Sequence, residues 1–172
     1  MSIKIYKKHE IISKIPLSFF QNHAILTEMT THALPIRIYY EDTDAGGVVY
    51  HANYIKFAER GRTEFLRSLG HQNSDLEKTY GTLFLVKQVD IQYFKPAFLD
   101  DLLQLDTAIV WMKNSSFQMR QLFTKAGEII AEMHVTLVCV QANTIKPYRI
   151  PDVIRTEFEK FTLTVKKERT DA

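Results

Sequence analysis

The residue types best suited to chemistry in this sequence are gathered between positions 41 and 51. Three acidic residues fall within positions 41–44, a Gly-Gly pair follows at 46–47, and His51 closes the stretch. A strand-like alternation precedes it and an amphipathic pattern follows, so the acids are expected on a bend that faces the first turn of a helix. That turn has unpaired N–H groups and partial positive charge, which stabilise an electron-rich oxygen. A carboxylate on the bend could then attack, or help water attack, the carbon bonded to that oxygen.

The same residues also have simpler structural interpretations. Asp42 and Asp44 could cap or solvate a turn, and Asp42 is expected to support the bend rather than react. The His51 side chain could make only local hydrogen bonds, but its backbone N–H keeps its expected role in either case. Asn53 is a candidate helix cap. A calcium loop starting at Asp42 is disfavoured, because its twelfth position is Asn53 where a bidentate glutamate is needed.

The composition narrows the class of protein. The chain has 172 residues, 45% hydrophobic and 24% charged, which is typical of one globular domain. The net charge of +2 does not indicate the strongly basic surface that is typical of nucleic-acid-binding proteins. The single cysteine, Cys139, is expected to be a buried small hydrophobe.

No apolar run approaches the roughly 18 residues of a membrane span, so we expect a cytoplasmic protein without membrane insertion. The histidines show no metal-site spacing, and no metal or redox cofactor is expected.

Hydrophobic periodicity predicts the elements that must position the acidic bend. A strand over 35–41 precedes it, and a long helix over 53–69 follows, with Gly61 placed to allow close packing on a sheet. A short helix is expected over 74–81, four strands with hairpin-like connections between 83 and 141, and a final helix over 151–161. This order predicts an α+β fold, in which an antiparallel sheet wraps around one central helix.

One helix covers one face of such a sheet, so the other face or an open edge is expected to meet another subunit. The domain organisation follows from where the periodic pattern begins and ends. Residues 1–33 show no sustained period and are expected to be an N-terminal extension, with Met29 as the hypothetical natural start. The folded domain is expected over 34–163 and a charged C-terminal tail over 164–172.

The sequence EDTDAGGVVYHANY at 41–54, with the following helix, closely resembles the hotdog-fold acyl-CoA thioesterases. Within them it is similar to the 4-hydroxybenzoyl-CoA thioesterase family, and specifically to the YbgC-like branch associated with the Tol-Pal cell-envelope system. Weaker matches are YFKPA at 93–97 with the Asp-Asp pair at 100–101, and the Ser-Phe pair at 116–117. The resemblance covers roughly residues 35–160.

The resemblance implies a hotdog fold, with a five-stranded antiparallel sheet around one long central helix, assembled as a homodimer or homotetramer. It implies that Asp44 is the catalytic carboxylate, acting as nucleophile or general base. It also implies that the His51 backbone N–H polarises the thioester carbonyl of an acyl-CoA substrate. An acyl carrier protein stays open as the alternative carrier of the acyl group.

The resemblance also suggests where the substrate is bound. Gly47, Val48 and Tyr50 are expected to contact it on the bend. Lys113 and Ser116 are expected to contact it at the turn before the Ser-Phe pair, where relatives grip the CoA nucleotide. Lys113 is the only charged residue of that turn here, and a surface lysine is the rival interpretation of it.

Two other functions fit the same pattern. A hotdog hydratase or dehydratase would act on an acyl thioester without releasing a free thiol. A hotdog interaction protein would bind acyl carrier protein or cell-envelope partners, with hydrolysis incidental.

Overall fold

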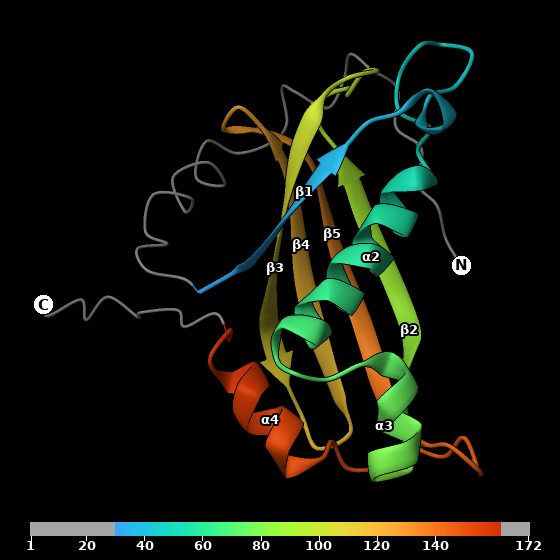
Figure 1. The fold of residues 1–172 in the computed structure, drawn as a ribbon, viewed down its shortest axis with the longest axis vertical. Helices are drawn as coiled ribbons and strands as arrows, with labels where there is room; N and C mark the ends of the chain where they lie inside the picture. Colours follow the sequence, from blue (N-terminus) through green and yellow to red (C-terminus); the bar gives the residue numbers. More distant parts are fainter. Residues whose placement is uncertain (1–29, 163–172) are drawn as a thin grey trace, which may run out of the picture.

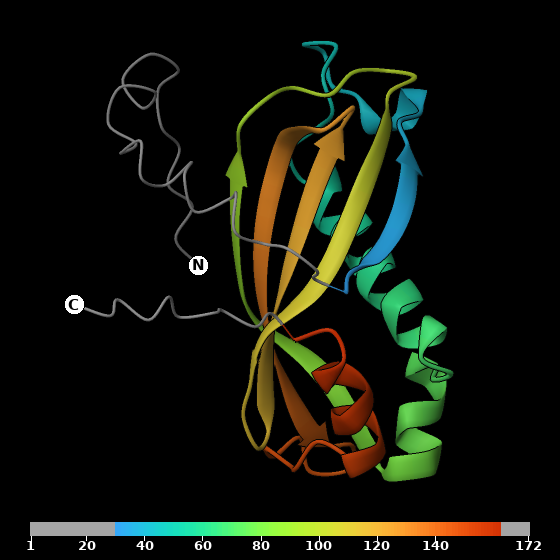
Figure 2. The same ribbon diagram turned by 90° about the vertical axis from the view of Figure 1, so that its left-hand side faces the viewer.

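The computed structural model describes residues 30–162, which form one antiparallel sheet with helices on one side (Figures 1 and 2). The elements in chain order are β1 (His32–Arg37), the 3-10 turn η2 (Tyr40–Asp42), α2 (Asn53–Ser68), α3 (Asn73–Tyr80), β2 (Thr82–Tyr93), β3 (Leu102–Met112), β4 (Ser116–Lys125), β5 (Glu128–Gln141) and α4 (Asp152–Glu159).

The five strands lie in the order β1-β3-β4-β5-β2, and every neighbouring pair is antiparallel. β3, β4 and β5 are joined by tight hairpins, which leaves β1 and β2 at the two edges. In β4 the buried residues alternate with partly buried ones, from Phe117 through Met119 and Gln121 to Phe123. This two-residue period places one face of the sheet against α2.

Helix α2 lies across that face, as Figure 1 shows. Tyr54, Phe57 and Phe65 are buried on its sheet side. Gly61 makes the close approach possible, because a Cβ at this position would lie 2.5 Å from Leu105 Cδ2. The expectation that Gly61 permits close packing is therefore confirmed. The opposite side of α2 stays exposed in a single chain, so the sheet covers only one side of the helix.

The end of α2 is closed by a Schellman motif. Gly70 adopts φ +82°, its N–H donates to the Arg67 carbonyl, and the His71 N–H donates to the Leu66 carbonyl. The helix ends at Ser68, one residue before the expected position. The short helix expected over 74–81 is α3, which stops at Gly81 in the left-handed region (φ +63°).

The first strand differs from the expected range of 35–41. It runs over His32–Arg37, because residues 40–42 turn back and the Tyr39 N–H donates to the Asp42 carboxylate at 2.9 Å. The final helix is α4 and is shorter than the expected 151–161. Of the expected N-terminal extension, only residues 30–33 are described, and the expected tail over 164–172 lies outside the described residues.

Candidate active site

The acidic bend is a closed hairpin between η2 and α2. The Asp44 N–H donates to the Val48 carbonyl at 2.9 Å, and the Gly47 N–H donates to the Asp44 carbonyl at 2.9 Å. Thr43 and Val49 pair across its base. Gly47 has φ +72°, which residues with a side chain rarely adopt. The turn therefore fixes Asp44 at its first position.

The Asp44 carboxylate is oriented by this turn and is exposed. Its Oδ1 accepts the Gly46 N–H at 2.8 Å, which leaves Oδ2 available. A Cβ at Gly46 would lie 3.1 Å from Oδ1, so the absence of a side chain at this position gives the carboxylate its space. The hairpin thus presents an exposed, backbone-held carboxylate.

Asp42 has a structural place, as expected. It is buried, its carboxylate accepts the Tyr39 N–H, and its carbonyl accepts the Tyr50 N–H at 2.8 Å. Asn53 also donates from Nδ2 to the Asp42 carbonyl at 3.0 Å. The prediction that Asn53 caps the helix is wrong: Ala52 occupies the cap position, and the buried Asn53 amide ties the first turn of α2 to the hairpin.

His51 lies two residues before the start of α2. Within residues 30–162 its backbone N–H donates no hydrogen bond, so it is a free donor at the electropositive end of a helix of 16 residues. Its ring is exposed and packs against Tyr50, with ring centroids 4.5 Å apart. Attack on a carbonyl carbon requires a donor for the carbonyl oxygen and a nucleophile or base for the carbon. This short loop has a free N–H and a carboxylate, which suit these two tasks.

Tyr93, at the end of β2, is a residue that the sequence did not single out for the site. Its hydroxyl donates to the His51 carbonyl at 2.9 Å, across 42 residues of chain. Burial raises the pKa of Tyr93, and burial raises the pKa of the neighbouring Tyr54 to about 12. Tyr93 therefore stays protonated and holds His51 in place. The only signal in the sequence was its position in the YFKPA match.

The expected substrate-binding residues fall into two groups. Gly47, Val48 and Tyr50 share the hairpin with the expected catalytic residues, and Val48 pairs with Phe98. Lys113 and Ser116 lie in the β3–β4 hairpin, at the opposite end of the sheet beside α4 (Figure 1). A single chain therefore does not bring these two groups together.

The β3–β4 hairpin is held against α4 by a side chain. The Arg155 guanidinium donates to the Lys113 carbonyl at 2.7 Å and to the Asn114 carbonyl at 3.1 Å. The Lys113 ammonium itself lies 5.3 Å from the centre of the Trp111 ring. The backbone of this hairpin is fixed, while the lysine head remains at the surface.

Two further features concern metals and membranes. Within residues 30–162, no three His, Cys, Asp or Glu side chains are grouped so that they could hold a metal ion. No helix in the same part of the chain has the length and apolar character needed to cross a membrane.

Comparison with known proteins gives consistent results. Residues 39–158 match the model of the thioesterase-like superfamily. Acyl-CoA thioester hydrolase YbgC of Escherichia coli O6:H1 is 41% identical over 127 residues, which cover 73% of this chain and 94% of that protein. Acyl-CoA thioesterase YbgC of Haemophilus influenzae is 38% identical over 126 residues, covering 73% and 93%. The solved structure of a probable thioesterase from Bartonella henselae superimposes with a TM-score of 0.67 at 34% identity, covering 71% and 100%.

These relatives confirm the expected likeness to the YbgC-like hotdog thioesterases, and the sheet order confirms the expected α+β class with a five-stranded antiparallel sheet. The match extends over the hairpin, α2 and strands β2 to β5. The chain belongs to the thioesterase-like superfamily.

Proposed function

We propose that this protein hydrolyses acyl-CoA thioesters to a free acid and CoA, with Asp44 as the reacting carboxylate and the His51 N–H as the oxyanion donor. The observation that carries the proposal is the pairing of an exposed, backbone-held carboxylate with a free helix-start N–H on one loop. The names of the YbgC relatives in Escherichia coli and Haemophilus influenzae support acyl-CoA as the substrate class.

In the proposed reaction, the thioester carbonyl oxygen accepts the His51 N–H. Asp44 either attacks the carbonyl carbon, giving a mixed anhydride that water then hydrolyses, or removes a proton from an attacking water. The C–S bond breaks and the sulfur leaves as a thiolate. A thiol has a solution pKa of about 8.5, so this group departs without a strong general acid. One carboxylate and one oxyanion donor are then sufficient, and no Ser-His-Asp triad is needed.

We also propose that two chains pair through β2. This edge strand, Thr82–Tyr93, has β5 as its single described neighbour, and most of its residues are exposed. Among them Val86 is 47% exposed and Val89 is 37% exposed. A long edge strand has a row of unpaired backbone N–H and C=O groups and is a template for strand pairing. Two-fold symmetry makes the pairing of two identical edges antiparallel.

The proposed pairing also explains the separation of Lys113 from Asp44. In an antiparallel pair, the end of the partner's sheet that carries the β3–β4 hairpin lies beside the end of this chain's sheet that carries the Asp44 hairpin. The partner subunit's Lys113 and the partner subunit's Ser116 then lie on the same side of the assembly as the hairpin, where the nucleotide part of CoA would extend. Association of two such dimers into a tetramer, acyl carrier protein as a second carrier and a role beside the Tol-Pal system are proposals that rest on the family likeness. A cytoplasmic location is a further proposal, which rests on the single cysteine of the sequence.

The direct test is thiol release from acyl-CoA by the wild type and by Asp44→Asn. Because the asparagine oxygen still accepts the Gly46 N–H, the hairpin is expected to stay intact, while kcat falls at least about 10²-fold. Asp75→Asn on α3 is the matched control and should keep the wild-type rate. Equal rates in Asp44→Asn and the wild type would remove Asp44 from the mechanism. Turnover of an enoyl-CoA without thiol release would instead indicate the hydratase class.

A further inference from the structure

We infer that Asp101 is a positioning residue for the reaction: its carboxylate holds the β2–β3 connection, residues 94–101, against the Asp44 hairpin and so sets the direction of the Asp44 carboxylate. The inference rests on the proposed function, because it assigns a residue that acts through Asp44. It depends on how Asp101 closes its own turn, on how that turn meets the hairpin, and on what holds the Asp101 carboxylate in place.

The β2–β3 connection ends in a turn that Asp101 closes from both directions. The Asp101 N–H donates to the Phe98 carbonyl at 3.1 Å, and the Phe98 N–H donates back to Asp101 Oδ2 at 2.9 Å. Asp42 closes the turn before the hairpin in the same way, since its N–H donates to the Tyr39 carbonyl at 3.0 Å and its Oδ2 accepts the Tyr39 N–H. Carboxylates that accept a nearby backbone N–H stabilise such turns. The hairpin is therefore bonded to two turns, each of which is closed by an aspartate.

The residue whose N–H the Asp101 carboxylate accepts also meets the hairpin. Phe98 pairs with Val48 across an isolated antiparallel bridge. The Val48 carbonyl in turn accepts the Asp44 N–H at 2.9 Å. Two backbone contacts, Phe98 to Val48 and Val48 to Asp44, therefore link the Asp101 carboxylate to the backbone of the proposed reacting residue.

Further backbone hydrogen bonds attach the connection to its surroundings. The Val49 N–H donates to the carbonyl of the buried Ala97 at 2.8 Å. On the other side, the Ile38 N–H donates to the Asp101 carbonyl at 2.9 Å, and the Asp100 N–H donates to the Ile38 carbonyl at 3.1 Å. The connection thus lies between the hairpin and the residue that follows β1, so a shift of the Asp101 turn would be passed to the hairpin.

The second oxygen of the Asp101 carboxylate has its own partner. Lys125, the last residue of β4, forms an ion pair with Asp101 Oδ1 at 2.7 Å, and the Asp101 side chain is only 13% exposed. Burial acts to raise the pKa of Asp101, but the hydrogen bonds from Lys125 and Phe98 and the charge of Lys125 outweigh it and lower this pKa below its ordinary value. Asp101 is therefore ionised at neutral pH, with one oxygen on the connection and the other on the sheet.

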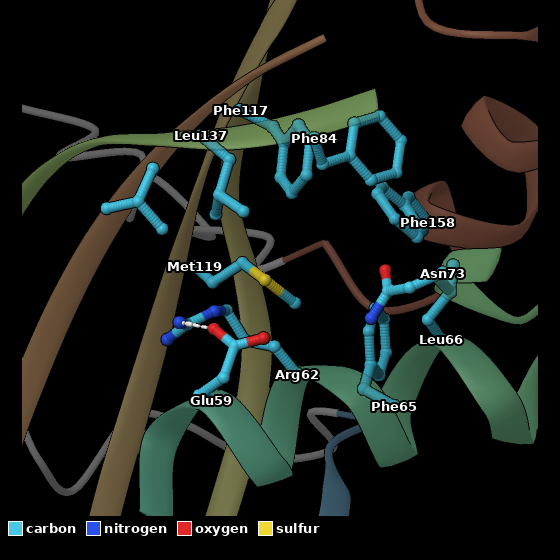
Figure 3. A pocket seen from close by; sticks show the side chains of 11 residues that line it. Glu59, Arg62, Phe65, Leu66, Asn73, Phe84, Phe117, Met119, Leu137 and Phe158 are labelled. Carbon is cyan, nitrogen blue, oxygen red and sulfur yellow. Dashed lines mark hydrogen bonds and ion pairs between the residues drawn. The ribbon is translucent and has the colours of Figure 1, made fainter. Parts of the chain in front are cut away.

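Arg62, another charged side chain with little exposure, has contacts of a different kind. It lies in the packed core between α2 and the sheet, where it forms an ion pair with Glu59 (Figure 3). Its Nη1 donates to Gln121 Oε1 at 2.9 Å, and Gln121 donates to the Ala58 carbonyl at 2.8 Å. These bonds join α2 to β4, whereas the bonds of Asp101 lead to Asp44.

The test is a double-mutant cycle on thiol release by the full-length protein. It uses whichever of acetyl-, butanoyl-, octanoyl- and benzoyl-CoA the wild type hydrolyses fastest. Asp101→Ala removes the acceptor for the Phe98 N–H and should lower kcat by about tenfold to 10²-fold, because small displacements of a reacting group are costly. KM should change by less than about twofold. In the Asp44→Asn background, Asp101→Ala should lower kcat by less than about a further twofold, since no reacting carboxylate is left to misplace.

Two isosteric substitutions separate the positioning role from general damage to the turn. Asp101→Asn keeps a side-chain oxygen for the Phe98 N–H and should restore kcat to within about threefold of the wild type, because a partly exposed ion pair contributes little. Asp100→Asn is the matched control and should keep the wild-type kcat. Within residues 30–162 the hydrogen bonds of Asp100 come from its backbone N–H and carbonyl, and asparagine tolerates its φ of +67°.

A second variant keeps the inference testable if Asp101→Ala does not fold. Lys125→Glu changes a partly exposed residue and places a carboxylate beside Asp101, which should draw Asp101 away from the Phe98 N–H and lower kcat at least about threefold. Lys78→Glu, the same change at an exposed position of α3, should keep the wild-type kcat.

Several results would overturn this inference alone. They are a wild-type kcat in folded Asp101→Ala or in Lys125→Glu, an equal fold-loss from Asp101→Ala in the Asp44→Asn background, an effect confined to KM, and a loss that Asp101→Asn does not restore. A wild-type rate in Asp44→Asn, or no thiol release from any of the four substrates by the wild type, would instead overturn the proposed function.

Discussion

Gly46 and Gly47 are adjacent in the Asp44 hairpin, but an added methyl group would have different effects at the two positions. At Gly46 it would lie 3.1 Å from Asp44 Oδ1, while at Gly47 it would contact nothing within 4 Å but would be held at φ +72°. The first substitution therefore crowds the Asp44 carboxylate, which is the proposed reacting group, and the second strains the backbone. The two substitutions therefore test separately the position of the Asp44 carboxylate and the stability of the turn.

We expect Gly46→Ala to lower kcat about tenfold or more, because small displacements of a reacting group are costly, with little change in the free energy of unfolding. Gly47→Ala should lower the free energy of unfolding by about 1 kcal/mol. Gly127→Ala is the control for strain, since Gly127 also has positive φ (+82°) with open space around it and lies in the β4–β5 turn outside the site. Thiol release and urea unfolding measure the two effects. A normal kcat in Gly46→Ala would contradict the assigned position of the carboxylate.

At the scale of elements, β4 and β5 are joined on one face by a charged cluster. Arg120 Nε and His134 Nε2 both approach Glu132 Oε1, at 2.6 Å and 3.2 Å. Hydrogen bonding from His134, followed by that from Arg120, lowers the pKa of Glu132 to about 2, although burial acts in the opposite direction. The cluster links two central strands and should contribute to stability.

The direction of its pH dependence follows from proton linkage. Below the ordinary glutamate value of 4.5 the unfolded chain binds a proton that the folded protein does not take up until about pH 2. The stabilisation from Glu132 is therefore complete above pH 4.5 and is lost as the pH falls toward 2. Glu132→Gln should lower the free energy of unfolding by about 1–3 kcal/mol at pH 7. The difference in this free energy between the variant and the wild type should disappear as the pH falls from 4.5 toward 2. Urea unfolding from pH 7 to 2.5 measures it, and a gap independent of pH would contradict the assignment.

Elements whose sequence carries a local signal were predictable. The apolar spacing of α2 predicted its bounds to within one residue, and the hairpin-like connections expected between 83 and 141 join β3 to β4 and β4 to β5. The expected first strand was placed too far along the chain because residues 40–42 bind back to Tyr39, a local turn that alternation of side chains does not reveal.

Contacts between distant parts of the chain could not be predicted. The Tyr93–His51 hydrogen bond spans 42 residues and the Arg62–Gln121 bond spans 59. Both depend on strand order, which places β1 beside β3 and leaves β2 at the opposite edge. The sequence therefore indicated Asp44 and His51, but not Tyr93, the residue that holds His51.

At the scale of the whole molecule, the proposed β2 pairing predicts a mass in solution of at least twice the 20.0 kDa of one chain. Val89→Glu should shift the protein toward monomers, because pairing would bury the new carboxylate among apolar side chains without a partner. Val153→Glu is the matched control, since Val153 is 56% exposed on α4 and does not belong to the β2 edge strand. Light scattering measures the mass. A dimeric Val89→Glu variant would show that the chains assemble through another surface.

The hydroxyl of Tyr93 gives this assembly a consequence for regulation. Tyr93, the last residue of the edge strand that is proposed to pair, also donates its hydroxyl to the peptide unit that precedes α2. In the proposed dimer, separation of the subunits would remove the partner strand from that edge and would weaken the hydrogen bond that holds His51. The specific activity would then depend on the protein concentration. It would fall when the protein is diluted and rise again when the protein is concentrated, so the amount of protein in the cell would regulate its activity.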